Sequence, residues 1–142
     1  MNVPEVVRYW LESADDDWPV VKHLMNSGDY HYALFFGHLH LEKLLKALVV
    51  KATGEHAPRT HNLLILAERT NVVLSDEKRR QLVRFTAYNL ETRYPEDRLL
   101  LRDRYSKSFT ETELQLIEEV ASWLKQEPVS YTHLTLPTSD LV

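Results

Sequence analysis

Residues 30–52 are apolar around most of a helical circumference, and this segment constrains the fold more than any other part of the chain. Its side chains recur at three- and four-residue spacing in two stripes rather than one. The first stripe contains Phe36, His40, Leu44, Ala47 and Leu48, and the second contains Phe35, Leu39, Leu45 and Val49. A helix that is apolar on two sides is buried centrally or shared with a partner chain. We therefore expect such a helix from about Tyr30 to Ala52, ending at Gly54.

A first helix precedes this segment. Asn2, followed by Pro4, is a favourable helix start, because proline is tolerated in the first turn. Apolar residues then recur with helical spacing as far as Leu24. Pro19 removes one amide donor, which predicts a kink or short break near Asp15–Trp18.

The second half of the chain has three further helical segments. Thr60 is expected to cap a short helix that carries Leu63, Leu64, Leu66 and Ala67. Ser75 is expected to cap a fourth helix that ends near Arg93, because a proline at position 95 disfavours helical geometry in the residue before it. A charged connector follows over residues 96–108. Thr110 and Glu113 then match a capping box before a final helix.

These segments predict an all-α fold, an antiparallel up-and-down bundle of four to five helices. With 142 residues and 44% apolar content, the chain suits one domain with a single core, which we place at residues 1–127. The absence of cysteine excludes disulfides and thiolate chemistry within this sequence and fits a reducing cytoplasm. No signal peptide and no membrane-spanning apolar run is evident, so we expect a cytoplasmic protein.

Residues 128–142 differ in composition from everything before them. Serine and threonine dominate, and the helical period is lost after Pro128. Residues 130–138 read Ser-Tyr-Thr-His-Leu-Thr-Leu-Pro-Thr, which looks like translated sequencing-adapter read-through. A natural β-prone tail is the alternative interpretation.

The net charge of −4 conceals a strong segregation of charge along the chain. Residues 78–107 hold nine basic and four acidic side chains, a net charge of +5, and the remainder therefore carries −9. Such a basic segment can attract a phosphate-rich or acidic partner. The more economical interpretation is a solvated surface that pairs with acidic residues of the same chain.

Two charged residues interrupt the apolar helix of residues 30–52. Glu42 and Lys46 have the spacing and order of a favourable i,i+4 pair. Because Glu42 lies among apolar residues, we expect a further partner, Arg93 or Tyr88. The sequence thus predicts a structural polar clamp of Glu42, Lys46 and Arg93, with a ligand-facing role as the alternative.

Five residues are candidates for binding a ligand. The candidates are His61, Asn62, Tyr88, Arg93 and Tyr94. An arginine can bind a phosphate through two parallel hydrogen bonds, tyrosines can stack on a base, and amides at a helix start can receive an anion. For each of them a purely structural role is the alternative.

A metal site is not predicted. Although the chain has seven histidines, His38 and His40 are two residues apart and cannot share an ion on one helix face. His38 and Glu42 can converge, but two ligands do not make a site. We expect His38 and His40 to be partly buried and hydrogen-bonded, and no cofactor is predicted.

Two segments carry a resemblance to a known family. Residues 41–47, Leu-Glu-Lys-Leu-Leu-Lys-Ala, and the later Arg93-Tyr94-Pro95 corner resemble the HEPN (higher eukaryotes and prokaryotes nucleotide-binding) domain family over about residues 4–126. The resemblance implies a helical bundle that forms a homodimer. It also implies a non-catalytic module that partners a minimal nucleotidyltransferase, as in a toxin–antitoxin-like or substrate-binding pair.

The resemblance does not extend to the ribonuclease motif of the family, an arginine followed four to six residues later by histidine. No arginine of this chain has a histidine at that distance. General acid–base cleavage of RNA therefore lacks its expected proton carrier. A nucleotide- or RNA-binding module and a divergent metal-independent ribonuclease remain the two alternatives to an interaction module.

Overall fold

The computed structural model describes the backbone of residues 1–132 and the side chains of residues 1–126 except Thr92 and Leu99. This part of the chain is all-helical, with six α-helices and one short 3-10 helix. The elements are α1 (Val3–Asn26), α2 (Tyr30–Thr53), α3 (Leu63–Glu68), α4 (Asp76–Thr86), η1 (Leu90–Thr92), α5 (Pro95–Arg102) and α6 (Lys107–Thr132). The predicted antiparallel helical bundle is therefore confirmed.

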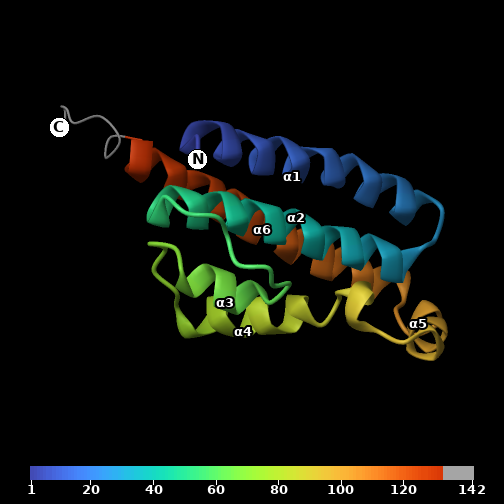
Figure 1. The fold of residues 1–142 in the computed structure, drawn as a ribbon. Helices are drawn as coiled ribbons and strands as arrows, with labels where there is room; N and C mark the ends of the chain where they lie inside the picture. The colour runs from blue at the N-terminus through green and yellow to red at the C-terminus, as the bar shows by residue number, and fades with distance from the viewer. Residues whose placement is uncertain (133–142) are drawn as a thin grey trace.

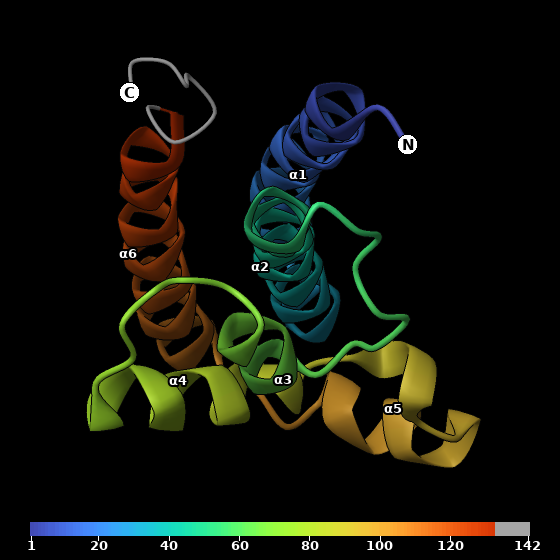
Figure 2. The same ribbon diagram turned by 60° about the vertical axis from the view of Figure 1, so that its left-hand side comes forward.

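Helix α2 lies at the centre of this bundle (Figures 1 and 2), with α1 and α6 on either side and with α3 and α4 below it in the first view. Helices α1 and α4 run in one direction, and α2 and α6 run in the other. Buried residues occur on most of the circumference of α2, which explains its two apolar stripes. Of the two alternatives predicted for this segment, central burial within the chain is the one that the structure shows.

A glycine allows α6 to approach α2 closely. A Cβ atom at Gly37 would lie 3.1 Å from Leu114 Cδ2 and 3.2 Å from Ile117 Cδ1. These distances are shorter than ordinary van der Waals contacts, so a larger side chain at position 37 would push the two helices apart. Gly54 has a different role: its positive φ of 72° ends α2 with a left-handed cap, as the sequence predicts.

Helix α1 continues through Pro19 without the predicted break. Proline removes one amide donor, but residue 19 is exposed, while the flanking residues Ala14, Asp17 and Val21 are buried. Packing on both sides of the proline therefore keeps the helix continuous.

Several helix boundaries differ from the sequence prediction. Asn62 rather than Thr60 caps α3, and its Oδ1 accepts a hydrogen bond from Ile65 N at 3.0 Å. Helix α4 begins at the predicted Ser75 cap but ends at Thr86, well before Arg93. The difference arises because residues 87–89 turn away and Asn89 caps the 3-10 helix η1.

The charged connector contains a helix that periodicity alone did not reveal. Pro95 stands at the first position of α5, where its missing amide has no hydrogen-bond partner to lose. The next helix, α6, begins at Lys107 rather than at the predicted capping box. Thr110 is instead buried inside it, donating to the Ser106 carbonyl, and α6 continues through Pro128 to Thr132. The remainder of the predicted tail, residues 133–142, lies outside the described residues.

None of the helices in the described part of the chain has the length and apolar content needed to cross a bilayer.

Candidate functional site

Glu42 is the centre of a polar cluster on α2. The residue is only 5% exposed, so its carboxylate needs partners to offset the loss of hydration. Lys46, one helical turn later, donates to Oε2 at 2.9 Å. The His61 Nδ1–H donates to Oε1 at 2.8 Å from the loop that precedes α3. The structure thus brings Glu42 and Lys46 together, with His61 as the third member.

A second histidine attaches the same loop to α2. His38 is fully buried, and its Nε2 lies 2.9 Å from the backbone carbonyl oxygen of His61 and 3.8 Å from Glu42 Oε1. A carbonyl only accepts, so His38 Nε2 carries the proton and donates. Burial lowers the pKa of His38, although the hydrogen bond to His61 and the charge of Glu42 oppose this effect. The side chain is therefore a neutral donor that holds the loop in place.

His61 has one nitrogen at the buried carboxylate and the other at the surface. Its Nε2 lies 3.6 Å from Glu91 Oε2 on η1, and its side chain is 39% exposed. A carboxylate that orients an imidazole in this way also fixes which nitrogen carries the proton. Such a pair can transfer protons in principle. However, the second carboxylate at the surface would repel a phosphate group that approaches this nitrogen.

Arg93 lies outside the Glu42 cluster. Its guanidinium donates to the Ala87 carbonyl oxygen at 2.6 Å and so closes the turn that follows α4. The neighbouring Tyr94 is the N-cap residue of α5 and is 74% exposed. The predicted contact between Arg93 and Glu42 depended on a longer α4. Because α4 ends at Thr86, Arg93 reaches the turn instead.

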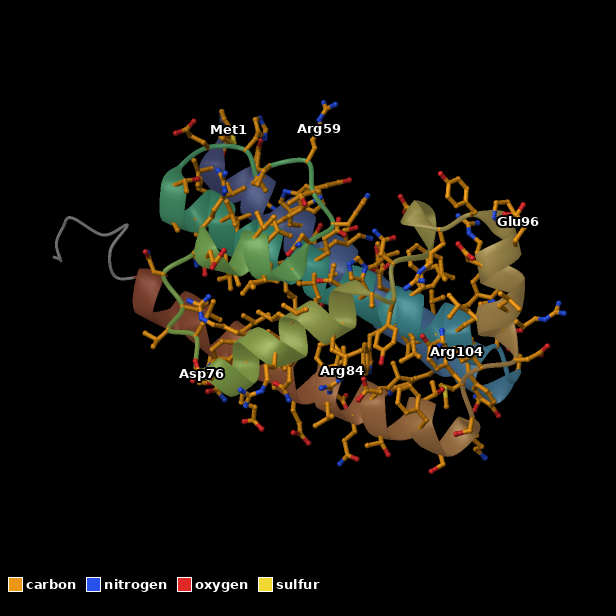
Figure 3. The ribbon with its side chains drawn as sticks, turned by 90° about the horizontal axis from the view of Figure 1, so that it is seen from below. Met1, Arg59, Asp76, Arg84, Glu96 and Arg104 are labelled. Atoms are coloured by element: carbon orange, nitrogen blue, oxygen red, sulfur yellow. The ribbon has the colours of Figure 1, made fainter. Side chains whose placement is uncertain are left out.

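A second buried carboxylate is Glu113 of α6, and it is bound by Arg84 of α4, which Figure 3 labels. Arg84 donates to both of its oxygens, at 2.9 Å from Nε and 3.2 Å from Nη2. Tyr88, which is 6% exposed, donates its hydroxyl to Oε1 at 2.5 Å. Burial, followed by the bond to Glu113, raises the pKa of Tyr88, and the bond to Glu113 also raises the pKa of Arg84.

Sequence reasoning missed this second cluster because it interpreted Glu113 as a capping residue. One signal was available in the sequence. Glu113 has the same helical spacing as the apolar residues Ile117, Val120 and Leu124, so it belongs to the buried stripe of its helix. A carboxylate on such a stripe requires a buried donor.

Of the five candidate ligand residues, Tyr94 has the largest exposed fraction. Asn62 uses its side-chain oxygen as a helix cap, and α3 has only six residues. Tyr88 is buried against Glu113, and its ring stacks on Phe85 at a centroid distance of 6.3 Å. His61 and Arg93 make the contacts described above. The structure therefore distributes these five residues over separate contact groups instead of gathering them in one pocket.

The basic segment of residues 78–107 pairs in part with acidic residues elsewhere in the chain. Arg79 lies 2.9 Å from Glu68, and Arg84 is held by Glu113. The Lys78 ammonium lies over the ring of Trp123, 5.3 Å from its centroid. Across the described residues, no three His, Asp or Glu side chains are grouped so as to hold a metal ion.

Comparisons with known proteins agree with this architecture. Residues 7–127 match the model of the HEPN domain. The crystal structure of TT1696 from Thermus thermophilus is similar in fold, with a TM-score of 0.72 and 22% sequence identity. The similarity covers 84% of this chain and 96% of that chain. Among curated proteins, none matches this sequence.

Proposed function

The chain belongs to the HEPN domain family, and from this premise we propose that it is a non-catalytic, dimeric interaction module that partners a minimal nucleotidyltransferase. The observation that carries the proposal is the use of the candidate polar groups in internal contacts. Glu42 accepts hydrogen bonds from Lys46 and His61, and Tyr88 donates a hydrogen bond to Glu113. Groups held in this way stabilise the bundle and are not available as a preformed nucleotide site.

The surface for the homodimer is the apolar strip of α2, which we define as Tyr32, Phe35 and Leu39. These residues follow one another at helical spacing, and Tyr32 is 41% exposed, while Phe35 and Leu39 are partly exposed. Their neighbours on α2 are otherwise largely buried. A central helix that keeps an apolar strip at the surface supports association with a second copy.

Sedimentation of charged variants tests the dimer. We expect wild-type protein to be a dimer at micromolar concentration and the Tyr32→Glu/Leu39→Glu variant to be a monomer with unchanged helicity. Val73→Glu/Val83→Glu is the matched control, because these residues are 86% and 56% exposed and lie outside the strip. A monomeric wild-type protein, or a dimer that survives the strip variant, would remove this part of the proposal.

Co-expression tests the partner. The proposal predicts that the neighbouring reading frame encodes a minimal nucleotidyltransferase and that the two proteins copurify as a complex of fixed stoichiometry. The complex should survive high salt better than binding to RNA does, because contacts to phosphates weaken as counterions compete for them. Failure of the two proteins to copurify would contradict the proposed partner.

A nucleotide- or RNA-binding function is the second candidate, and one observation favours it. Tyr94 projects from the Arg93 corner with 74% of its surface exposed, and Arg102 and Arg104 are exposed nearby in the chain. An exposed aromatic ring can stack on a base while exposed arginines elsewhere on the same segment contact phosphates. Under this hypothesis, Tyr94→Ala should weaken binding of a labelled single-stranded RNA, and rising salt should weaken it further.

A further inference from the structure

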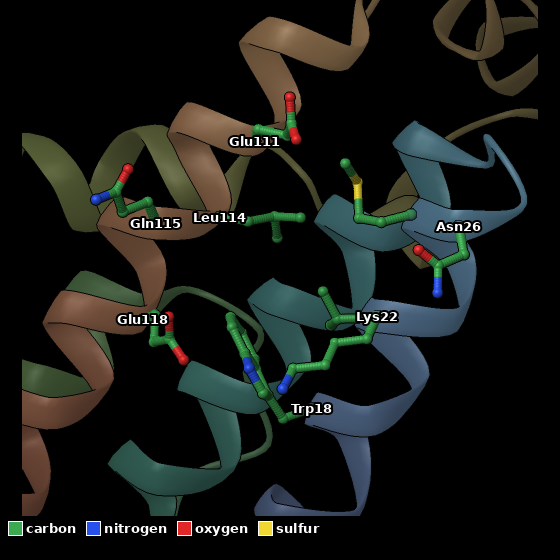
Figure 4. Close-up of a pocket in the computed structure, with 9 residues that line it drawn as sticks. Trp18, Lys22, Asn26, Glu111, Leu114, Gln115 and Glu118 are labelled. Carbon is green, nitrogen blue, oxygen red and sulfur yellow. The ribbon is translucent and has the colours of Figure 1, made fainter.

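Helices α1 and α6 flank α2 without closing over it, and their side chains line an open cavity of about 510 Å³ (Figure 4). Four residues supply most of its apolar lining: Trp18, Val21, Met25 and Leu114. The Trp18 ring lies between Lys22 of α1 and Glu118 of α6 in this view. The cavity is thus a trough with an apolar floor and polar edges.

Two smaller cavities extend the trough in both directions. One of about 120 Å³ shares Trp18 and Glu118 with it, and one of about 390 Å³ shares Met25 and Glu111. Together they follow α1 from Asp15 to Asn26, a length of about 17 Å at about 1.5 Å per residue. This length corresponds to about three turns of an α-helix. At the narrow end, Lys125 of α6 lies 3.9 Å from Asp15 of α1.

The α6 edge of the trough is acidic at its centre, whereas lysines of α6, Lys107 and Lys125, line the two smaller cavities at its ends. Glu111 and Glu118 line the central cavity, and Glu119 lies beside Glu118 on the outer face of α6. All three are exposed, and within the part of the chain that the structure describes none of them is joined to a cation. The opposite edge is formed by Lys22 and Asn26 of α1. A partner that fills the trough would therefore meet carboxylates at the middle of the α6 edge and a lysine at each end.

We infer that the trough receives an amphipathic helix of the partner protein, with an apolar stripe against Trp18, Met25 and Leu114 and with basic residues at the middle of the edge that faces α6, opposite Glu111 and Glu118. This inference rests on the proposed interaction function and gives it a location. The length of the trough, its apolar floor and the exposed carboxylates match helix-in-groove recognition, in which side chains at i, i+3, i+4 and i+7 anchor the helix. Basic residues complement the α6 edge and fix the orientation of the bound helix.

The test uses the full-length protein and a displayed library of helical peptides. Leucines are fixed at helical spacing, and the two flanking edges are varied among Lys, Gln and Glu. We expect selection to enrich peptides with Lys on one edge. Their affinity should fall at least tenfold for Glu111→Lys/Glu118→Lys.

The control variant Glu12→Lys/Asp16→Lys makes the same change in net charge at exposed positions of α1 that do not line the trough. This control should bind the selected peptides as wild type does. Selected peptides without a basic edge would overturn the inference. Equal loss of affinity in both variants would do the same, because it would show attraction to overall charge and not to the trough.

Further outcomes separate this inference from the proposed function. If the nucleotidyltransferase complex forms equally well with Glu111→Lys/Glu118→Lys, the partner does not use the trough, although the proposed function stands. If wild-type protein forms no such complex, the proposed partner is wrong, and the peptide selection alone decides whether the trough binds helices. If the Glu111→Lys/Glu118→Lys variant dissociates a wild-type dimer, the trough belongs to a second copy, which overturns the inference.

Discussion

Glu42 and Glu113 are both buried glutamates held by one cation and one further donor, but their partners lie at different distances along the chain. Glu42 takes its cation from Lys46, one turn later on the same helix, and its second donor from His61. Glu113 takes both donors from the region of α4, where Arg84 and Tyr88 precede it by 29 and 25 residues. The first cluster attaches a loop to the central helix, and the second joins two helices.

The two cations also differ in exposure. The side chain of Lys46 is 12% exposed, and its ammonium lies 5.1 Å from the centre of the Trp10 ring. The side chain of Arg84 is 44% exposed, so water remains in contact with this guanidinium. Removing the cation from either cluster should leave a buried carboxylate without its charged partner. The loss of folding stability should be larger at Glu42, because less water reaches the site of Lys46 than the site of Arg84.

The largest effect is expected for Lys46→Ala. With only His61 left as a donor, the buried Glu42 carboxylate should lower the free energy of unfolding by about 3 kcal/mol. Urea denaturation measures this loss, and the exposed Lys22→Ala serves as the control. Adding Glu42→Gln to Lys46→Ala should restore part of the stability, since no charge is then left alone. A loss no larger than that of the control would show that Glu42 is well hydrated.

Arg84→Ala is expected to cost about 1–2 kcal/mol, less than Lys46→Ala, because Tyr88 still donates to Glu113 and water can reach the site that the guanidinium leaves. Urea denaturation again measures the loss. Arg79→Ala is the matched control, because Arg79 and Glu68 form an exposed pair that should contribute less than about 1 kcal/mol. If Arg84→Ala proved more costly than Lys46→Ala, the ranking of the two clusters by exposure would be wrong.

Acidification should weaken the Glu42 side of the molecule through His38. Burial places the pKa of His38 below its ordinary value of 6.5. At pH values between the two pKa values, the unfolded chain therefore binds a proton on His38 and the folded chain does not. The stabilising contribution is complete above pH 6.5 and is lost as the pH falls from 6.5 toward the lower folded pKa. The slope is at most about 1.4 kcal/mol per pH unit for one histidine. Stability measured between about pH 5 and pH 8 should fall less steeply in His38→Gln than in wild type, and equal slopes would contradict this role.

Arg93→Ala should have the smallest effect, less than about 1 kcal/mol, because it removes one hydrogen bond to a carbonyl at an exposed turn. The sequence-based prediction of a contact with Glu42 implied a loss of about 3–5 kcal/mol. A double-mutant cycle with Glu42→Gln distinguishes the two, since independent sites add. An interaction energy above about 0.5 kcal/mol in this cycle would show that Arg93 contacts the Glu42 cluster after all.

Local patterns predicted most of the fold. The spacing of apolar residues located α1, α2, α4 and α6, and capping chemistry placed Ser75 and Gly54 correctly at helix ends. The errors occurred where two local signals competed. Pro19 predicted a break that packing prevented, and Thr110 with Glu113 matched a capping box inside a helix that had already begun.

The candidate site was less predictable, because its contacts join distant parts of the chain. The pairing of Glu42 with Lys46 follows from a spacing of one helical turn and could be predicted directly. The choice of His61 as their partner depended on the path of the loop that follows α2. The position of Arg93 depended on where α4 ends, a boundary that Tyr88 and Asn89 set through tertiary contacts and a local cap.

The sequence by itself thus determined an all-helical chain with a central helix buried on several sides, because the spacing of apolar residues specifies both helical periodicity and the buried faces. Only the tertiary structure decided which donors reach Glu42 and Glu113, and that α1 and α6 leave a trough over α2. The physical reason is that a buried charge requires some partner but does not specify which one. The partner is selected by the directions in which packed helices bring their side chains together.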